Sequence, residues 1–199
     1  MQLRRVAALG LTAALWSTPV WAQHRFDVGL LGGWASASKE GAVLEFDQSA
    51  TYQATLGWPV RRSGKVTLSI ELPLFATPAL GVKTPGTALP KEYASLFLTP
   101  GLRVSVFDTR RLVLFGTVGA GYARYSESRE RVDKSPNPAQ LDTNTGAFAF
   151  GGGLELRDGW LGVRGEVRDV VTGPRQFSVA PPGQRVHNLL LSLGFAVRF

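Results

Sequence analysis

The sequence contains no cysteine, only two histidines and, after its first residues, no long hydrophobic run. The lack of cysteine excludes disulfides and every site that requires a thiolate. Two histidines are too few for a typical histidine-based metal site, and we expect neither a metal ion nor any other cofactor. Hydrophobic residues still make up 44% of the chain. Because no segment after residue 22 approaches the roughly 20 consecutive apolar residues of a membrane-spanning helix, these residues are distributed along the sequence.

The formal net charge is +7, yet the basic residues are scattered among acidic ones and form no patch. Nucleic-acid binding proteins usually gather lysine and arginine on one face, so we expect no nucleic-acid partner. A positive rim that faces anionic lipid headgroups accounts for the excess of basic residues at least as well.

Residues 1–22 have the three parts of a secretory signal peptide. Arg4 and Arg5 begin the segment, residues 6–16 are apolar, and Val20 and Ala22 occupy the positions that a signal peptidase reads. A helix over residues 6–16 is too short to cross a hydrocarbon core of about 30 Å. The sequence therefore predicts an exported protein with a signal peptide at 1–22 and one domain at 23–199.

The end of the sequence alternates with a period of two. Leu189, Leu191, Leu193, Phe195, Val197 and Phe199 fall on one face, and mostly small or polar residues fall on the other. This period predicts a β-strand. In a membrane barrel the apolar face contacts lipid, and the small or polar face lines the interior.

Seven further segments are predicted to be strands, at about 26–34, 52–58, 66–74, 96–106, 112–125, 147–156 and 161–168. The two faces of segment 112–125 are too similar for either to be assigned to lipid. Pro73 and Pro100 lie inside predicted strands. Because proline removes a donor from the hydrogen-bonded ladder, we expect irregularities at both positions.

The connections between these segments alternate in length. Short turns are expected at 61–64, 108–111 and 157–159, and long loops at about 37–50, 76–92, 127–144 and 173–186. Short periplasmic turns and longer external loops are typical of bacterial outer-membrane barrels. The sequence therefore predicts an all-β fold, an eight-stranded antiparallel up-and-down transmembrane β-barrel with both ends in the periplasm.

Aromatic residues lie near the predicted strand ends, at Trp34, Trp58, Tyr93, Phe107, Tyr125 and Trp160. Rings at these positions would form the girdles found at the two membrane interfaces. Ordinary β-sheet composition is the alternative explanation.

With these features the chain resembles the small outer-membrane β-barrel proteins, the OmpA/OmpX-like group. The signal peptide, the rhythm of eight strands and the ending LSLGFAVRF carry the resemblance. It implies a monomer in the outer membrane of a Gram-negative cell envelope, in contact with membrane lipid and lipopolysaccharide. It also implies that Leu191, Leu193, Phe195, Val197 and Phe199 form a signal for the outer-membrane assembly machinery. The roles of this group are mixed: structural, adhesive, resistance-related and, in a few branches, enzymatic.

The predicted alternation places charged residues inside the barrel. They are Asp27, Glu71, Arg103, Glu155, Arg164, Glu166, Arg168 and Arg198. Eight strands enclose an interior just wide enough for side chains to fill, and isolated buried charges are costly. We therefore expect a structural ion-pair network, with a gated ion path as the alternative.

We expect no catalytic residues. His187 is the one candidate base, and no serine stands in a recognisable arrangement around it, although a hydrolase needs a base within reach of its nucleophile. The expected function is a non-enzymatic barrel with a structural or surface-interaction role through its loops. Lys83, Lys91, Arg175 and Arg185 are candidates to meet lipopolysaccharide phosphates, with plainly solvated loops as the alternative. Three other functions stay open: a narrow porin-like pore, a lipid-modifying enzyme and a soluble barrel that holds an apolar ligand.

Overall fold

A computed structural model describes residues 26–37, 48–81, 90–108, 111–137, 142–173 and 185–199. The predicted signal peptide at 1–22 lies outside the described residues. Among the described residues, no helix has the length and apolar content needed to cross a membrane.

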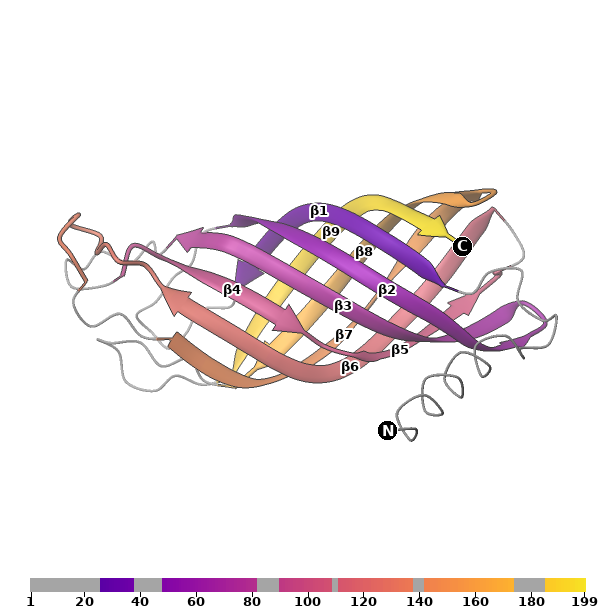
Figure 1. Cartoon of the computed structure of the whole chain (residues 1–199), viewed down its shortest axis with the longest axis horizontal. Helices are drawn as coiled ribbons and strands as arrows, with labels where there is room; N and C mark the ends of the chain where they lie inside the picture. The colour runs from indigo at the N-terminus through magenta and orange to yellow at the C-terminus, as the bar shows by residue number, and fades with distance from the viewer. Residues whose placement is uncertain (1–25, 38–47, 82–89, 109–110, 138–141, 174–184) are drawn as a thin grey trace, which may run out of the picture.

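The described chain folds into one antiparallel sheet that closes on itself (Figure 1). Its strands are β1 (Asp27–Ala37), β2 (Ser49–Ser63), β3 (Val66–Gly81), β4 (Glu92–Leu98), β5 (Gly101–Val106), β6 (Leu112–Glu127), β7 (Asp142–Asp158), β8 (Leu161–Thr172) and β9 (Val186–Arg198). Each strand pairs with its neighbours in the chain, except that β4 and β5 pair with β3 and β6 and not with each other. Strand β1 pairs with β9 to complete the ring. Because β4 and β5 lie in line between β3 and β6, the nine segments make eight transits of the barrel. The predicted eight-stranded antiparallel barrel is confirmed.

Two prolines lie beside the break between β4 and β5. Pro100 stands in the break itself, and the Thr99 N–H donates to the Pro73 carbonyl of β3 at 3.4 Å. The Pro100 carbonyl accepts a hydrogen bond from Ala120 of β6 at 3.1 Å. The irregularity expected at these positions is therefore present, and the ladder resumes in register on both sides of it.

Some predicted connections are wrong in position. Strand β7 continues to Asp158, so the turn expected at 157–159 begins only at Gly159. Strand β3 continues to Gly81, with a register shift between Thr77 and Leu80, so residues 76–81 belong to a strand and not to a loop. Strand β2 continues to Ser63, and its turn to β3 lies at Gly64 and Lys65. Gly64 has a φ of 58°, which glycine adopts without steric cost.

The barrel has two distinct ends. The turns β2–β3 and β7–β8, the β5–β6 connection and residues 26 and 199 lie at one end, here called the turn end (Figure 1). The rings of Phe26 and Phe199 stack there, with their centroids 4.8 Å apart. The longer connections leave the strands at the opposite, loop end.

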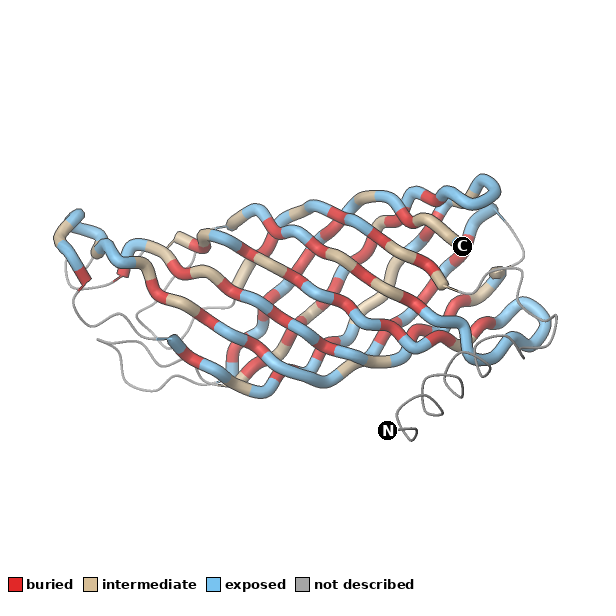
Figure 2. The backbone as a smooth tube through the Cα atoms, in the orientation of Figure 1, coloured by how far each residue is buried: buried red, intermediate tan, exposed pale blue. Residues whose placement is uncertain are grey.

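Burial alternates along every transit, so the outer face is apolar and the inner face is mostly polar (Figure 2). Leu193 is 63% exposed, and its neighbours Ser192 and Gly194 point inward. Strand β6, whose facing the sequence left open, points Val113, Phe115 and Tyr125 inward and Leu114 and Val118 outward. In water such an outer face would leave large apolar side chains exposed on every transit.

The predicted aromatic girdle is partly wrong. Trp34, Trp58, Phe107 and Trp160 are exposed on the outer face or at its turns, as a girdle requires. Tyr93 and Tyr125 are only 1% and 3% exposed, because their positions in β4 and β6 point into the barrel.

Candidate functional site in the barrel interior

All eight charged residues that the sequence placed inside the barrel lie there, on strands β1, β3, β5, β7, β8 and β9. Arg164 of β8 is fully buried at the centre of this group. Its guanidinium lies 2.9 Å from carboxylate oxygens of both Asp27 and Glu155, and it also donates to the Thr55 hydroxyl at 3.2 Å. Four strands, β1, β2, β7 and β8, are thereby joined through one side chain.

Two other arginines extend these contacts across the interior. Arg103 bonds to Asp27 and lies 3.3 Å from Glu71. Arg168 lies 2.8 Å from the other oxygen of Glu71 and 2.7 Å from Glu166. Glu166 also accepts a hydrogen bond of 2.6 Å from the Gln53 amide. Each of these carboxylates is therefore held by at least two donors.

Toward the turn end the contacts continue through residues that the sequence analysis did not select. Glu155 pairs with Arg198 and, at 3.0 Å, with Arg157. Arg157 also pairs with Asp108, which lies 2.8 Å from Arg62. Arg62, Asp108 and Arg157 fall in segments expected to be solvated turns. Charged residues in every segment expected to be a short turn were the sequence signal for this contact.

Asp108 lies in the β5–β6 connection at the turn end. It joins this connection to the β2–β3 hairpin on one side and the β7–β8 hairpin on the other. It accepts hydrogen bonds from Thr67, Arg157 and Arg62. Burial acts to raise the pKa of this carboxyl, but the three donors and the nearby Arg157 charge outweigh burial and lower the pKa below its usual value of 3.8. Asp108 is therefore ionised at neutral pH.

Together these groups form one connected set, here called the charge network. It contains the carboxylates Asp27, Glu71, Asp108, Glu155 and Glu166 and the arginines Arg62, Arg103, Arg157, Arg164, Arg168 and Arg198. Buried charges are tolerated only when they are paired and hydrogen-bonded. The planar fork of arginine suits this arrangement because it contacts two carboxylates at once.

Aromatic rings adjoin the network. The guanidinium carbons of Arg164 and Arg103 lie 5.6 and 5.8 Å from the centre of the Phe115 ring, and Arg168 lies 5.3 Å from that of Phe75. These distances allow cation–π attraction. Phe75 also belongs to the apolar cluster nearer the loop end, so it joins the two halves of the interior.

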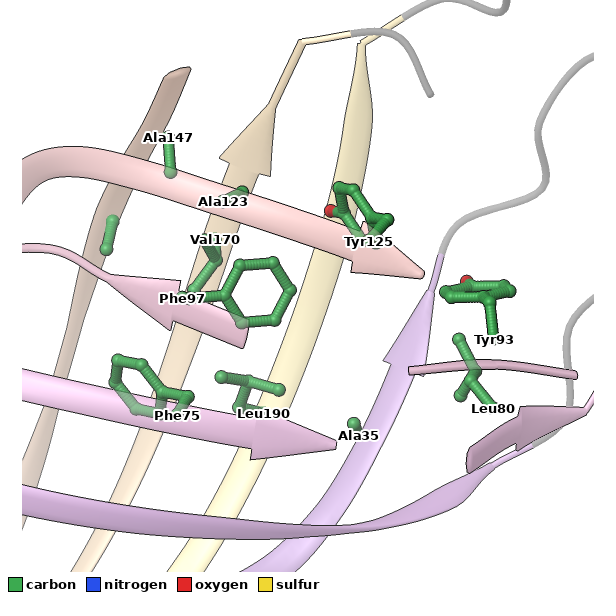
Figure 3. Close-up of a cluster of buried hydrophobic side chains, with 11 residues drawn as sticks. Ala35, Phe75, Leu80, Tyr93, Phe97, Ala123, Tyr125, Ala147, Val170 and Leu190 are labelled. Carbon is green, nitrogen blue, oxygen red and sulfur yellow. The ribbon is translucent and has the colours of Figure 1, made fainter. Parts of the chain in front are cut away.

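The loop-end half of the interior holds a cluster of buried apolar side chains, here called the apolar plug (Figure 3). Its members are Ala35, Phe75, Leu80, Tyr93, Phe97, Ala123, Tyr125, Ala147, Ala149, Val170 and Leu190. The Tyr125 ring meets the rings of Tyr93 and Phe97 edge-on, with centroids 5.9 and 5.7 Å apart. Its hydroxyl bonds to Thr172 at 2.8 Å and accepts from Asn188 at 3.2 Å. The plug therefore lies on the loop-end side of the charge network, with polar contacts to its neighbours.

The outer face carries polar groups near the loop end. The His187 Nδ1 atom lies 2.7 Å from the Asp169 carboxylate, and Arg124 pairs with Asp142 at 2.7 Å. Of the predicted lipopolysaccharide contacts, Lys83 and Arg175 lie outside the described residues. Lys91 lies 3.6 Å from Glu130, and Arg185 is exposed.

The residues of the predicted assembly signal lie on the outer face of β9 and at its end. Leu191, Leu193, Phe195 and Phe199 are exposed, and Val197 is half-buried. Within the described residues, no group of three or more histidine, aspartate or glutamate side chains is arranged to hold a metal ion.

No protein-family model matches the chain, and no curated protein sequence matches it. Solved structures match it along most of its length. Neisserial surface protein A (NspA) is 12% identical, with a TM-score of 0.60, over 87% of this chain and 97% of that one. OprG from Pseudomonas aeruginosa is 13% identical, with a TM-score of 0.54, over 88% and 97%. The N-terminal β-barrel domain of Pseudomonas aeruginosa OprF is 8% identical, with a TM-score of 0.51, over 89% and 100%. The chain therefore has the fold of the small eight-stranded outer-membrane β-barrels.

Proposed function

We propose that this protein is a non-enzymatic integral barrel of the bacterial outer membrane, with a structural or surface-interaction role through its long loops. The observation that carries the proposal is the inversion of polarity between its faces. Large apolar side chains cover the outer face, and buried ion pairs fill the inner one. A soluble barrel with an apolar ligand inside would need the opposite arrangement.

The filled interior supports a barrel that does not conduct. The charge network occupies the turn-end half and the apolar plug occupies the loop-end half, so ions crossing the barrel would have to displace both. Eight strands leave little space beyond that taken by side chains.

The first experiment compares unheated and boiled samples of the outer-membrane fraction on SDS gels. A closed barrel keeps its hydrogen-bonded ladder in SDS until it is heated, so we expect two bands of different mobility. A single band in the soluble periplasmic fraction would contradict the proposal.

A planar bilayer experiment separates this proposal from a narrow pore. We expect no steady conductance steps from the purified barrel. Steps that change in size when Arg103 or Arg164 is replaced by glutamine would instead assign the interior as an ion path. The heat-modified band of each variant serves as the control for folding.

We also propose that the protein is a monomer and that its last strand is read by the outer-membrane assembly machinery. Replacement of the terminal ring by Phe199→Ser is expected to lower the amount of assembled barrel several-fold. Trp160→Ser, which removes an equally exposed ring at the turn end, is the matched control. Equal losses in both variants would show that the terminal ring acts only as part of the girdle.

The His187–Asp169 pair favours a second candidate function, a lipid-modifying enzyme. A histidine oriented by a carboxylate is the base of many hydrolases. Ser36 of β1 lies on the same outer face and pairs in register with Leu189, two residues from His187. Lipid A from cells expressing the protein is compared by mass spectrometry with lipid A from His187→Ala cells. Identical masses would eliminate this candidate.

A further inference from the structure

We propose that the turn end of the barrel is a binding site for a small oxyanion that carries a phosphate or carboxylate group. The site is a cavity of about 360 Å³ at the mouth of the interior, here called the vestibule. Five arginines line it: Arg62, Arg103, Arg111, Arg157 and Arg198. Three aspartates, Asp27, Asp108 and Asp158, also lie along its wall.

The side chains of two of the three aspartates of the wall are buried, whereas Asp158 is exposed. The side chains of Asp108 and Asp27 are 5% and 8% exposed, whereas that of Arg62 is 53% exposed. Asp108 already accepts from Arg62, Thr67 and Arg157, and Asp27 from Arg103 and Arg164. An incoming anion therefore meets N–H donors whose nearest carboxylates are already engaged.

The charge network as a whole carries an excess of positive charge. Its six arginines face five carboxylates, and each guanidinium offers five N–H donors. Arg103 is an example of an arginine with too few hydrogen-bond acceptors. It lines the vestibule and is 3% exposed, and its Nε is buried without an acceptor among the described residues. A bound anion would supply the missing acceptor and negative charge.

The donor type sets the class of ligand. Guanidinium groups bind oxyanions through pairs of parallel N–H···O bonds, and both phosphate and carboxylate match this geometry. The Ser69 and Ser105 hydroxyls of the vestibule add neutral donors. Chloride offers a single acceptor atom to a fork, whereas an oxyanion offers two oxygens to its two parallel N–H groups, so the vestibule is expected to favour oxyanions.

The test uses the folded barrel in detergent, in a phosphate-free buffer of fixed ionic strength. Inorganic phosphate, succinate and chloride are titrated separately by calorimetry. We expect saturable binding of phosphate, succinate or both, at one site per barrel, and none of chloride. The affinity for phosphate relative to that for succinate tells whether the natural ligand bears a phosphate or a carboxylate group.

Two arginine variants locate the site. Arg111→Gln removes a vestibule charge that is not part of the charge network, so the barrel should keep its heat-modified band. We expect it to weaken anion binding at least fivefold. Arg124→Gln, the same change on the outer face near the loop end, should leave binding unchanged. Binding that chloride matches, that both variants weaken equally, or that never saturates would overturn the proposal.

Discussion

At the scale of single residues, the interior depends on arginines that each hold two acids. Arg164 is fully buried and holds Asp27 and Glu155 through separate bonds. An exposed ion pair is screened by water and contributes little. A buried pair behaves differently, because removal of one member leaves the other charge without a partner in a poorly solvated place.

The first prediction concerns this buried arginine. Arg164→Met should lower the free energy of unfolding by about 3–5 kcal/mol, because Asp27 and Glu155 each lose a partner. Urea titration of the barrel in lipid vesicles, followed on SDS gels, measures the change. Arg124→Met breaks the exposed pair with Asp142 and should cost less than about 1 kcal/mol. Similar losses for the two variants would contradict the prediction.

The second prediction concerns pH. The folded-state pKa of Asp108 lies below its usual value of 3.8, so ionised Asp108 stabilises the fold above that value. This contribution is lost as the pH falls through the lower folded-state pKa. Asp108→Asn should therefore cost about 1–3 kcal/mol at neutral pH and progressively less as the pH falls below about 4.

Urea unfolding of both proteins between pH 7 and pH 2, at constant ionic strength, measures this difference. A cost of the Asp108→Asn change that stays constant over the whole range would show that the charge of Asp108 does not matter. Its neutral hydrogen bonds would then explain the effect.

At the scale of elements, barrel closure depends on the seam between β1 and β9. The register pairs Gly33 with Ser192 and Leu31 with Gly194. A Cβ atom on Gly33 would overlap the carbonyl oxygen of Leu191, and one on Gly194 would overlap that of Leu30. The first and last strands therefore approach each other closely at pairs in which one residue is glycine.

The third prediction compares two adjacent glycines of this seam. Gly33→Ala should destabilise the barrel by about 1–3 kcal/mol, because the added methyl group forces the backbone of β9 to move. Gly32→Ala places its methyl group in open space and should be neutral or slightly stabilising. The temperature at which the heat-modified band disappears measures both. A larger loss for Gly32→Ala would contradict this account of the seam.

Most elements could be predicted because one face of each strand is consistently apolar, as in β9. The facing of β6 could not, since it alternates Val113 and Phe115 with Leu114 and Val118, and similar residues give no contrast. Strand β3 was followed only to Leu74 because Pro78, a few residues further on, resembles part of a loop. In the structure a register shift accommodates that proline.

The charged residues of the interior could be placed from the two-residue period of the strands alone. Once one face of a strand is assigned to lipid, every residue of the other face points into the barrel. Arg62 and Arg157 were missed because their strands run further into the turns than the sequence indicates. Tyr93 and Tyr125 were assigned to the girdle because an aromatic residue near a strand end fits both the girdle and the interior. Only the position of the residue in the inward–outward alternation of its strand decides whether the ring lies in the girdle or in the interior.

At the scale of the whole molecule, the protein is arranged in reverse of a soluble globule. Its apolar residues cover the outside, and its ion pairs lie inside. The interior is also divided along the axis, with the charge network near the turn end and the apolar plug near the loop end. The molecule is therefore asymmetric along the direction in which it would cross a membrane.

The fourth prediction tests the surroundings of the outer face. Val118 lies there, near the middle of β6, and is exposed. In a bilayer Val118→Arg should cost about 2–4 kcal/mol, because the charge would face hydrocarbon. Val132→Arg, at an exposed position outside the strands, should cost little. Unfolding in lipid vesicles measures both, and a neutral Val118→Arg would indicate that this face contacts water.

The charge network also bears on the order of folding. The Asp27–Arg164 bond joins residues 137 positions apart, and the Gln53–Glu166 bond joins residues 113 apart. Contacts of such sequence separation cannot form while the ring is open. A half-assembled barrel would therefore contain unpaired guanidinium and carboxylate groups in a poorly solvated interior. Partly closed states are then high in free energy. The ion pairs of the network form late, together with closure of the ring, and make closure a single cooperative step.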